Sequence, residues 1–329
     1  MMLYRDVLKR AWYVTWRNKA LWLFGFLALF WGIGGVYEVV AQGFRLASRH
    51  DFYFIKLWNA VASAGVSFGS LKTLFLSTPL YGLLLVGIFV VFVLLLLFFY
   101  WIFTCSQITV IKQVADIDSN ARSNAFSSFY KSRQYFWPVL GINLINKIVT
   151  FVLLVIFTYG IMALVVTEAL FVSQVFYLLS FILFVVVILV LSFLVVYGTI
   201  YISVYNKPFI AAIQSAWKLF INNWLVSLEV AAILFVITVL VAIATGVLVT
   251  ILSGILYFVS IIVLFINLPI LYFVSFAILM VIFVIMVFII AAVLSTFQLA
   301  VWVELFDHLE SNRITSKLQR IASAKLGVK

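Results

Sequence analysis

Charged residues, cysteine and histidine are all scarce in this 329-residue chain, and each shortage excludes a class of protein. Only 9% of the residues are charged, whereas soluble domains carry about 25%, so an ordinary water-soluble enzyme is excluded. The single cysteine, Cys105, excludes a disulfide framework or a cysteine-based metal centre within one chain. Nucleophile-elbow, Walker-type and strand-linked Gly-x-Gly-x-x-Gly patterns are also lacking. We therefore expect no catalytic residues and no bound cofactor.

Apolar side chains are abundant instead: they make up 67% of the chain, and 18% of the residues are aromatic. A globule of this size has too little interior to hide so much apolar surface from water, which leaves the lipid bilayer as the solvent. In a membrane protein, the net charge of +11 indicates basic cytoplasmic segments and attraction to anionic headgroups, not nucleic-acid binding.

Charge-free intervals predict six transmembrane helices, near residues 20–42, 78–111, 147–168, 172–206, 226–250 and 270–305. The first is read as a retained helix because its basic leader and apolar stretch are longer than those of a signal peptide. Val230–Val303 is too long for one span, so we expect a break ending at Asn267 and Pro269, with Gly246 and Gly254 as further weak points. The odd-numbered helices are expected to be short.

Basic residues lie almost entirely on one side of this topology. With the N-terminus inside, 17 of the 21 Lys and Arg residues fall on inner segments, and the outer loops hold only Arg45, Arg49, Lys56 and Lys72. The positive-inside rule then places both termini in the cytoplasm and the chain in the cell (inner or plasma) membrane.

A threefold repeat precedes the odd-numbered helices. Trp12, Tyr130 and Trp217 each stand seven positions before the residue that leads into the next membrane helix. The predicted fold is therefore an all-α polytopic membrane protein of three hairpins, each preceded by an amphipathic interfacial helix. The repeat units cover about 1–111, 120–206 and 207–305 of a single membrane domain 1–329. A basic cytoplasmic helix is expected over 306–329.

The segments before the hairpins show helical amphipathicity. The first carries an apolar stripe on one helical face, and its charged residues lie on the opposite face. The stripe residues stand at i, i+3, i+4, i+7, i+8 and i+11 and are Tyr4, Val7, Leu8, Ala11, Trp12 and Thr15. Such helices are expected to lie in the inner headgroup layer, with aromatic side chains in the boundary and Lys or Arg toward phosphate. The alternative is that they are cytoplasmic helices that pack on one another. The side chains predicted to contact lipid headgroups are Arg5, Lys9, Arg10, Trp12, Lys131, Arg133, Trp217 and Lys218.

Few ionisable groups lie near the bilayer. Lys147 and Glu229 occupy equivalent places at the inner ends of helices three and five, so they form a candidate interhelical ion pair, the alternative being independent snorkelling. Glu304 and His308 share a helical face at i and i+4, but a second histidine is missing, so we expect the solvated end of helix six and no metal site.

The order of basic amphipathic helix, tryptophan and hydrophobic hairpin resembles a group of bacterial six-helix membrane proteins. This group includes the membrane domain attached to some glycerophosphoryl diester phosphodiesterases. The likeness is carried by Ile108–Leu140, with Asp116 and Asp118 followed by Ser123–Phe126 and by Phe136, Trp137 and Pro138. The catalytic barrel of those enzymes has no counterpart here, so the resemblance implies a membrane scaffold without hydrolase activity.

The sequence thus predicts a non-enzymatic integral membrane protein that organises lipid or a partner. Its expected partners are anionic headgroups of the cytoplasmic leaflet, with a protein partner or a second copy of the chain left open, and no nucleic acid. The alternative function is a small-solute or lipid transporter or channel, which would need a polar, water-accessible cavity near mid-bilayer.

Overall fold

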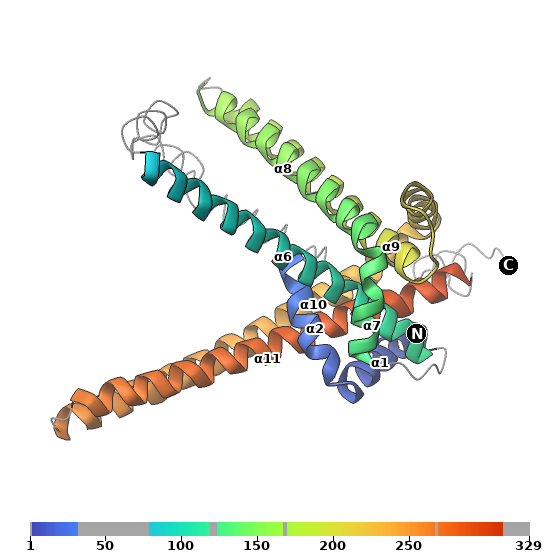
Figure 1. Ribbon diagram of the computed structural model, residues 1–329. Helices are drawn as coiled ribbons and strands as arrows, with labels where there is room; N and C mark the ends of the chain where they lie inside the picture. Colours follow the sequence, from blue (N-terminus) through green and yellow to red (C-terminus); the bar gives the residue numbers. More distant parts are fainter. Residues whose placement is uncertain (1, 32–78, 119–123, 167–169, 267–268, 312–329) are drawn as a thin grey trace. The chain divides into compact units, whose positions relative to one another are not determined.

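The computed structural model describes residues 2–31, 79–118, 124–166, 170–266 and 269–311 (Figure 1). Every regular element in these ranges is a helix, and no strand occurs there. Five helical stretches are long and apolar enough to cross a membrane: Val86–Ile117, Ala125–Ile156, Leu178–Ser203, Phe209–Val259 and Val274–Glu310. The predicted all-α class is confirmed, and the helices suit a multi-pass membrane protein.

The N-terminal region contains α1 (Met2–Arg17), α2 (Ala20–Ala28) and the short 3-10 helix η1 (Leu29–Trp31). α1 is the amphipathic helix expected there, and α2 begins where the first predicted span begins. The rest of that span lies outside the described residues, as does the predicted C-terminal basic helix beyond Ser311.

The later elements are longer. They are α6 (Pro79–Asp118), α7 (Ala125–Ser132), the 3-10 helix η2 (Arg133–Tyr135), α8 (Phe136–Val166), α9 (Leu170–Ser203), α10 (Phe209–Ile266) and α11 (Pro269–Glu310). α8 contacts α9, and α10 contacts both α9 and α11. α11 also contacts α1 and α2.

The predicted bounds of helices three and five are wrong. α8 begins at Phe136, well before residue 147, and α10 continues through Gly246 and Gly254 to Ile266. A glycine inside a helix costs about 1 kcal/mol, whereas an unsatisfied backbone group in lipid costs several. Continuing the helix through both glycines therefore costs less free energy than interrupting it. α10 ends at Ile266 and α11 begins at Pro269, so the two helix ends flank the position predicted for the end of the break.

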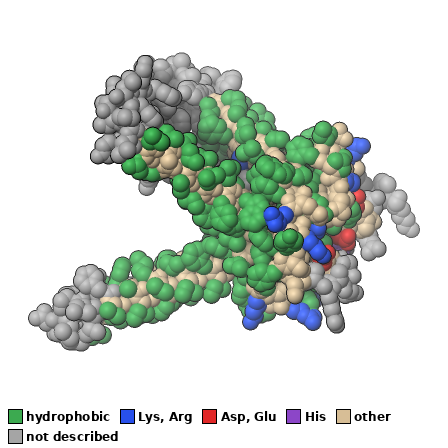
Figure 2. All heavy atoms as spheres, viewed as in Figure 1, with side chains coloured by type: hydrophobic (Ala, Val, Ile, Leu, Met, Phe, Trp, Pro, Cys, Tyr) green, Lys and Arg blue, Asp and Glu red, His purple; other side chains and the backbone are tan. Residues whose placement is uncertain are grey.

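The chain divides into two compact units, one of Met1–Tyr37 with Phe103–Lys329 and one of Glu38–Ile102. In the smaller unit, the α6 side chains that can be described are almost all exposed and apolar from Leu83 to Tyr100. That surface is suited to contact with lipid. In the larger unit, the α10–α11 pair likewise carries mainly hydrophobic side chains on its surface (Figure 2).

The core of the larger unit is built from the helix ends expected on the cytoplasmic side. Its largest fully buried side chains come from α2, α6, α9 and α11 and include Leu21, Ile108, Ile111, Tyr197, Ile200 and Phe306. Tyr197 contacts Phe306 with ring centroids 6.0 Å apart, and Tyr201 meets the same ring edge-on at 4.8 Å. Aromatic packing therefore ties the end of α9 to the end of α11.

The apolar stripe predicted for α1 is partly buried against the rest of the protein and partly exposed. Val7, Ala11 and Thr15 are buried, whereas Trp12 keeps 51% of its surface exposed. α1 packs against α11, so much of the face expected in the headgroup layer is covered by protein. The stripe is thus only partly available for the predicted headgroup contact, because α1 also packs against α11. The surface left for lipid is the narrower one around Trp12.

A break follows the amphipathic segment in all three places. Asn18 separates α1 from α2, η2 separates α7 from the body of α8, and Asn223 interrupts α10 with φ −129° and ψ 24°. Asn18 Nδ2 donates to the carbonyl of Val14 at 3.1 Å, and Asn223 Nδ2 donates to that of Leu219 at 3.2 Å. Each amide binds a carbonyl of the preceding turn, which helps to satisfy the helix end at the break.

Most hydroxyl groups within the long helices bond to their own backbone. Thr199, Thr238, Thr245 and Thr250 each donate to the carbonyl four residues earlier, at 2.7 to 2.9 Å. Such bonds satisfy a hydroxyl group within its own helix, so it needs no partner on a neighbouring helix. Directed bonds between helices are formed elsewhere by a few side chains, such as Gln298, whose Nε2 donates to Thr238 Oγ1 at 2.8 Å.

α2 and α11 pack very closely at Gly25. Ser295 Oγ donates to the Gly25 carbonyl at 2.7 Å, and Thr296 Oγ1 lies 3.2 Å from the carbonyl of Leu21. A Cβ added at Gly25 would lie 2.0 Å from Thr296 Oγ1 and 3.0 Å from the Ala292 carbonyl oxygen. Only glycine fits this contact, which lets two backbones approach as small residues do in membrane helix pairs.

Candidate functional site: a groove between α1, α10 and α11

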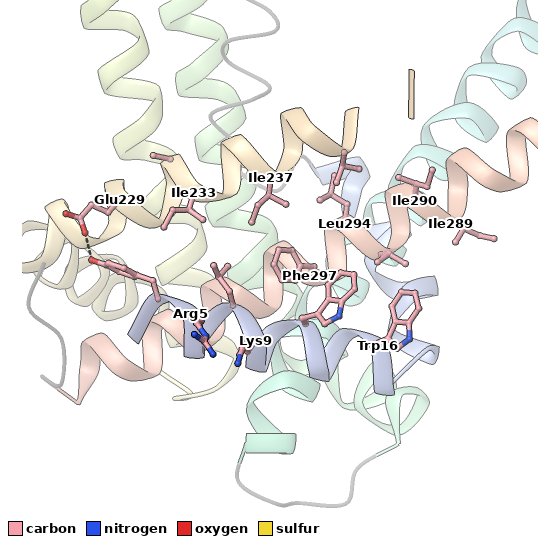
Figure 3. Close-up of a pocket in the computed structure, with 16 residues that line it drawn as sticks. Arg5, Lys9, Trp16, Glu229, Ile233, Ile237, Ile289, Ile290, Leu294 and Phe297 are labelled. Carbon is pink, nitrogen blue, oxygen red and sulfur yellow. Dashed lines mark hydrogen bonds between the residues drawn. The ribbon is translucent and has the colours of Figure 1, made fainter. Parts of the chain in front are cut away.

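A groove of about 1530 Å³ lies between α1, α10 and α11 in the larger unit (Figure 3). It is larger than the roughly 300–1,000 Å³ typical of small-molecule pockets. Two of its walls are apolar and one is amphipathic. The geometry follows from the helical periodicity of each wall.

The α10 and α11 walls consist mainly of apolar side chains at helical spacing, with Glu229 as the charged residue of the α10 wall. Ile233, Ile237 and Val241 recur every four residues along α10, and Ile290, Leu294 and Phe297 follow one face of α11. Most of these side chains are half-buried, while Phe297 is only 6% exposed and packs at the base. The groove therefore offers a continuous apolar surface with few polar atoms.

The α1 wall carries cations and indoles. Arg5, Lys9, Trp12 and Trp16 lie on one side of α1 at i, i+4, i+7 and i+11. The Trp12 and Trp16 rings stack with centroids 5.4 Å apart, and Trp12 meets Phe297 edge-on at 5.9 Å. Figure 3 shows Arg5 and Lys9 at the rim, with their nitrogen ends turned away from Ile233 and Ile237. The rim is thus cationic and the interior apolar.

Two polar contacts hold α1 beside the groove. The Tyr4 phenol donates a hydrogen bond to Glu229 Oε2 on α10. Further along α1, Arg10 Nε lies 3.1 Å from Glu304 Oε1 on α11, and this carboxylate side chain is only 3% exposed. α1 is therefore bonded to both α10 and α11, and these contacts bound the groove with ordered side chains.

All eight residues predicted to contact headgroups are exposed. Arg5, Lys9 and Trp12 meet at the groove. The others stand apart from them, Lys131 and Arg133 on α7 and η2, and Trp217 and Lys218 on the first segment of α10. Arg133 lies over the Tyr130 ring at 5.5 Å, so that cation has an aromatic neighbour. Arg10 is also exposed, and it pairs with Glu304 on α11.

The predicted Lys147–Glu229 ion pair stays a prediction. Lys147 is exposed on α8, and Glu229 is half-buried on α10, where it accepts the Tyr4 hydrogen bond. α8 and α10 do contact each other.

The polar cluster Glu304–Glu310 is only partly solvated, which corrects its prediction as the solvated end of helix six. Asp307 and Glu310 are exposed, but Glu304, Phe306 and Leu309 are buried. The reason is the ion pair of Glu304 with Arg10, which no local pattern reveals. His308 Nδ1 lies 2.8 Å from the Glu304 carbonyl oxygen. Among the residues that the structure describes, no group of three or more His, Cys, Asp or Glu side chains is arranged to hold a metal ion.

Comparison with other proteins gives no family assignment. No family model, curated protein or solved structure matches the chain significantly. The resemblance to phosphodiesterase membrane domains is therefore carried by the sequence pattern alone.

Sequence reasoning found the α1 wall of the groove but not the other two. Tyr4 and Trp12 on α1 were marked by amphipathicity, and Glu229 on α10 was marked by its charge. The apolar side chains of the α10 and α11 walls had no such mark, because a helix that is apolar all round has no distinguishable face. The face of α11 that lines the groove could be recognised only once the structure placed it beside the cationic helix α1.

Proposed function

We propose that this chain is a non-enzymatic integral protein of the cell membrane that binds anionic lipid at the cytoplasmic leaflet and acts there as a scaffold. One observation carries the proposal: the basic and aromatic side chains of α1, α7 and the first segment of α10 are exposed while the same helices bury their other faces in the core. Exposed cations beside indole and phenol rings suit the headgroup layer.

The proposed topology has six spans arranged as three hairpins, with both termini in the cytoplasm. The three breaks support a repeat, because Asn18, η2 and Asn223 each follow the aligned aromatic residue within six positions. The threonines at similar places in helices two, four and six also behave alike, since Thr104, Thr199 and Thr296 are all fully buried. A scaffold role is also what the resemblance to phosphodiesterase membrane domains implies. A protein partner or a second copy could use the exposed apolar surfaces.

The lipid-binding proposal is tested by removing cations that lie away from the groove. We expect the triple variant Lys131→Gln, Arg133→Gln and Lys218→Gln to lose preference for phosphatidylglycerol over phosphatidylcholine. Each Lys or Arg near an anionic surface contributes about 1 kcal/mol to the free energy of lipid binding, and salt screening reduces this contribution. We therefore expect the preference for phosphatidylglycerol to fall by about tenfold. The purified full chain is equilibrated with mixed lipids, and the lipids retained per protein are measured by mass spectrometry.

Gln134→Ala serves as the matched control, because this exposed neutral residue lies beside Arg133. It should leave the lipid preference unchanged. Arg10 stays native because its removal would unpair Glu304. If the triple variant retains as much phosphatidylglycerol as the native chain, the headgroup-binding role is wrong.

The alternative function, a carrier or channel, draws on polar side chains buried between α6 and α8. Asn143 Nδ2 donates to Gln107 Oε1 at 3.0 Å, and the buried Ser106 hydroxyl lacks a hydrogen-bond partner in the described part of the chain. A transport pathway would have to admit water to such groups.

Cysteine labelling separates the two functions. After Cys105→Ala, single cysteines are placed at Ser106, Gln107 and Asn143, the buried polar positions between α6 and α8 that a transport pathway would have to hydrate. The scaffold function predicts that a membrane-impermeant maleimide fails to label them in intact membranes or proteoliposomes, since packed side chains keep water out. Lys131→Cys is the positive control in inside-out vesicles. Labelling of these sites at the control's rate would favour transport.

A further inference from the structure

We propose that the groove between α1, α10 and α11 is a specific site for one anionic phospholipid taken from the surrounding leaflet. This rests on the proposed function, because it names the ligand class and the residues of one lipid site. The headgroup lies at the end of the groove that contains Tyr4, Arg5 and Lys9, and the acyl chains lie along Ile233, Ile237 and Val241.

The chemistry of the walls favours such a ligand. Apart from Glu229, the lining is apolar along α10 and α11, and Arg5 and Lys9 supply two cations at the rim. A polar solute would find almost no hydrogen-bonding group along α10 and α11, and a wholly apolar one would leave the cations unused. A molecule with one phosphate and two hydrocarbon chains satisfies both parts of the groove.

The carboxylate in the groove does not oppose this arrangement. Glu229 Oε2 accepts the hydrogen bond of the Tyr4 phenol. Arg5 and Lys9 line the same groove as Glu229, so two cations face one carboxylate and the net charge that a phosphate meets from these three side chains is positive.

The length of the groove also fits. Glu229 and Val241 are twelve residues apart on α10, which corresponds to about 18 Å of helix. One leaflet contributes about 15 Å to the hydrocarbon core. An acyl chain of ordinary length can therefore lie along the groove from end to end. The stacked Trp12 and Trp16 rings line the same groove, where indoles commonly meet lipid near the headgroup level.

The test blocks the groove without changing its charge. Ile237→Trp fills the middle of the α10 wall, and Leu240→Trp is the matched control, because Leu240 is 60% exposed on α10 and does not line the groove. The full chain in mild detergent is titrated with phosphatidylglycerol, and the bound lipids are counted by native mass spectrometry. We expect one saturable high-affinity phosphatidylglycerol on the native chain and on Leu240→Trp, and its loss on Ile237→Trp.

The charge of the site is tested separately with Arg5→Gln and Lys9→Gln together. This variant should lower phosphatidylglycerol affinity by about tenfold and leave phosphatidylcholine binding unchanged, because it removes both cations that attract an anionic headgroup, an attraction that salt partly screens. Equal affinity of the native chain and Ile237→Trp would overturn the groove site. So would a groove occupied by a second copy, which would show as a dimer that Ile237→Trp abolishes.

Failure of this site is distinguishable from failure of the proposed function. If Ile237→Trp keeps the high-affinity lipid while the Lys131, Arg133 and Lys218 triple variant loses its lipid preference, the groove is not the site and the general function stands. The opposite pair of results would keep the site and overturn the wider headgroup-binding role.

Discussion

Replacing Gly25 with alanine is expected to destabilise the protein by about 1–3 kcal/mol, the usual cost of overpacking a tight core. The added methyl would lie 2.0 Å from Thr296 Oγ1 and 3.0 Å from a backbone oxygen of α11, so the helices would have to separate. Separation would also lengthen the hydrogen bond from Ser295 to the Gly25 carbonyl. The buried thiol of Cys105 provides the measurement. A thiol-reactive fluorophore should report unfolding at a lower temperature in detergent.

The matched controls are Gly246→Ala and Gly254→Ala. An added Cβ at either glycine meets nothing within 4 Å, and alanine is the better helix former by about 1 kcal/mol. These variants should melt at the native temperature or slightly above it. A Gly25→Ala chain that melts together with them would show that α2 and α11 do not pack as described.

Replacing Arg10 with methionine is expected to destabilise the chain by about 2 kcal/mol. The substitution removes the counter-ion of Glu304, whose side chain is 3% exposed. Breaking a fully buried pair costs about 3–5 kcal/mol, and the smaller value is expected because Arg10 is itself half exposed. The same thermal assay on Cys105 reports the change.

A double-mutant cycle separates the ion pair from the packing of the Arg10 side chain. Adding Glu304→Gln to Arg10→Met should recover most of the lost stability, because a neutral amide is less costly to bury than an unpaired carboxylate. Lys9→Met, an exposed cation on the same helix, should change stability by no more than about 0.5 kcal/mol. Purely additive effects of the two substitutions would contradict a direct Arg10–Glu304 interaction.

The helical class and most helix positions follow from the sequence because lipid imposes so few alternatives. A charge-free stretch of twenty or more residues in a bilayer has to satisfy its backbone internally, and a helix does so. The ends of helices are less predictable. Gly246 and Gly254 looked like weak points, yet α10 passes through both, since local propensity is outweighed by the cost of exposed backbone in lipid.

The candidate site was predictable only where the sequence alternates in polarity. Arg5, Lys9 and Trp12 were marked by the amphipathic pattern of α1, and the structure places all three on one groove. Ile237 and Leu294 were not marked, because α10 and α11 are apolar on every face. The pairing of Arg10 with Glu304 was also missed, since it joins the first helix to the last and no spacing rule connects residues so far apart in the chain.

The self-bonded hydroxyl groups of the long helices have a consequence for helix registry. A threonine whose hydroxyl bonds only to its own backbone gives the adjacent helix no directional constraint, so sliding one apolar helix along another breaks few bonds. In the α10–α11 pair, the bond from Gln298 to Thr238 supplies such a constraint. The Gln298 amide lies where α10 and α11 enter the core. It thus favours one longitudinal alignment of the two helices over others that dispersion forces alone would leave nearly equal in energy.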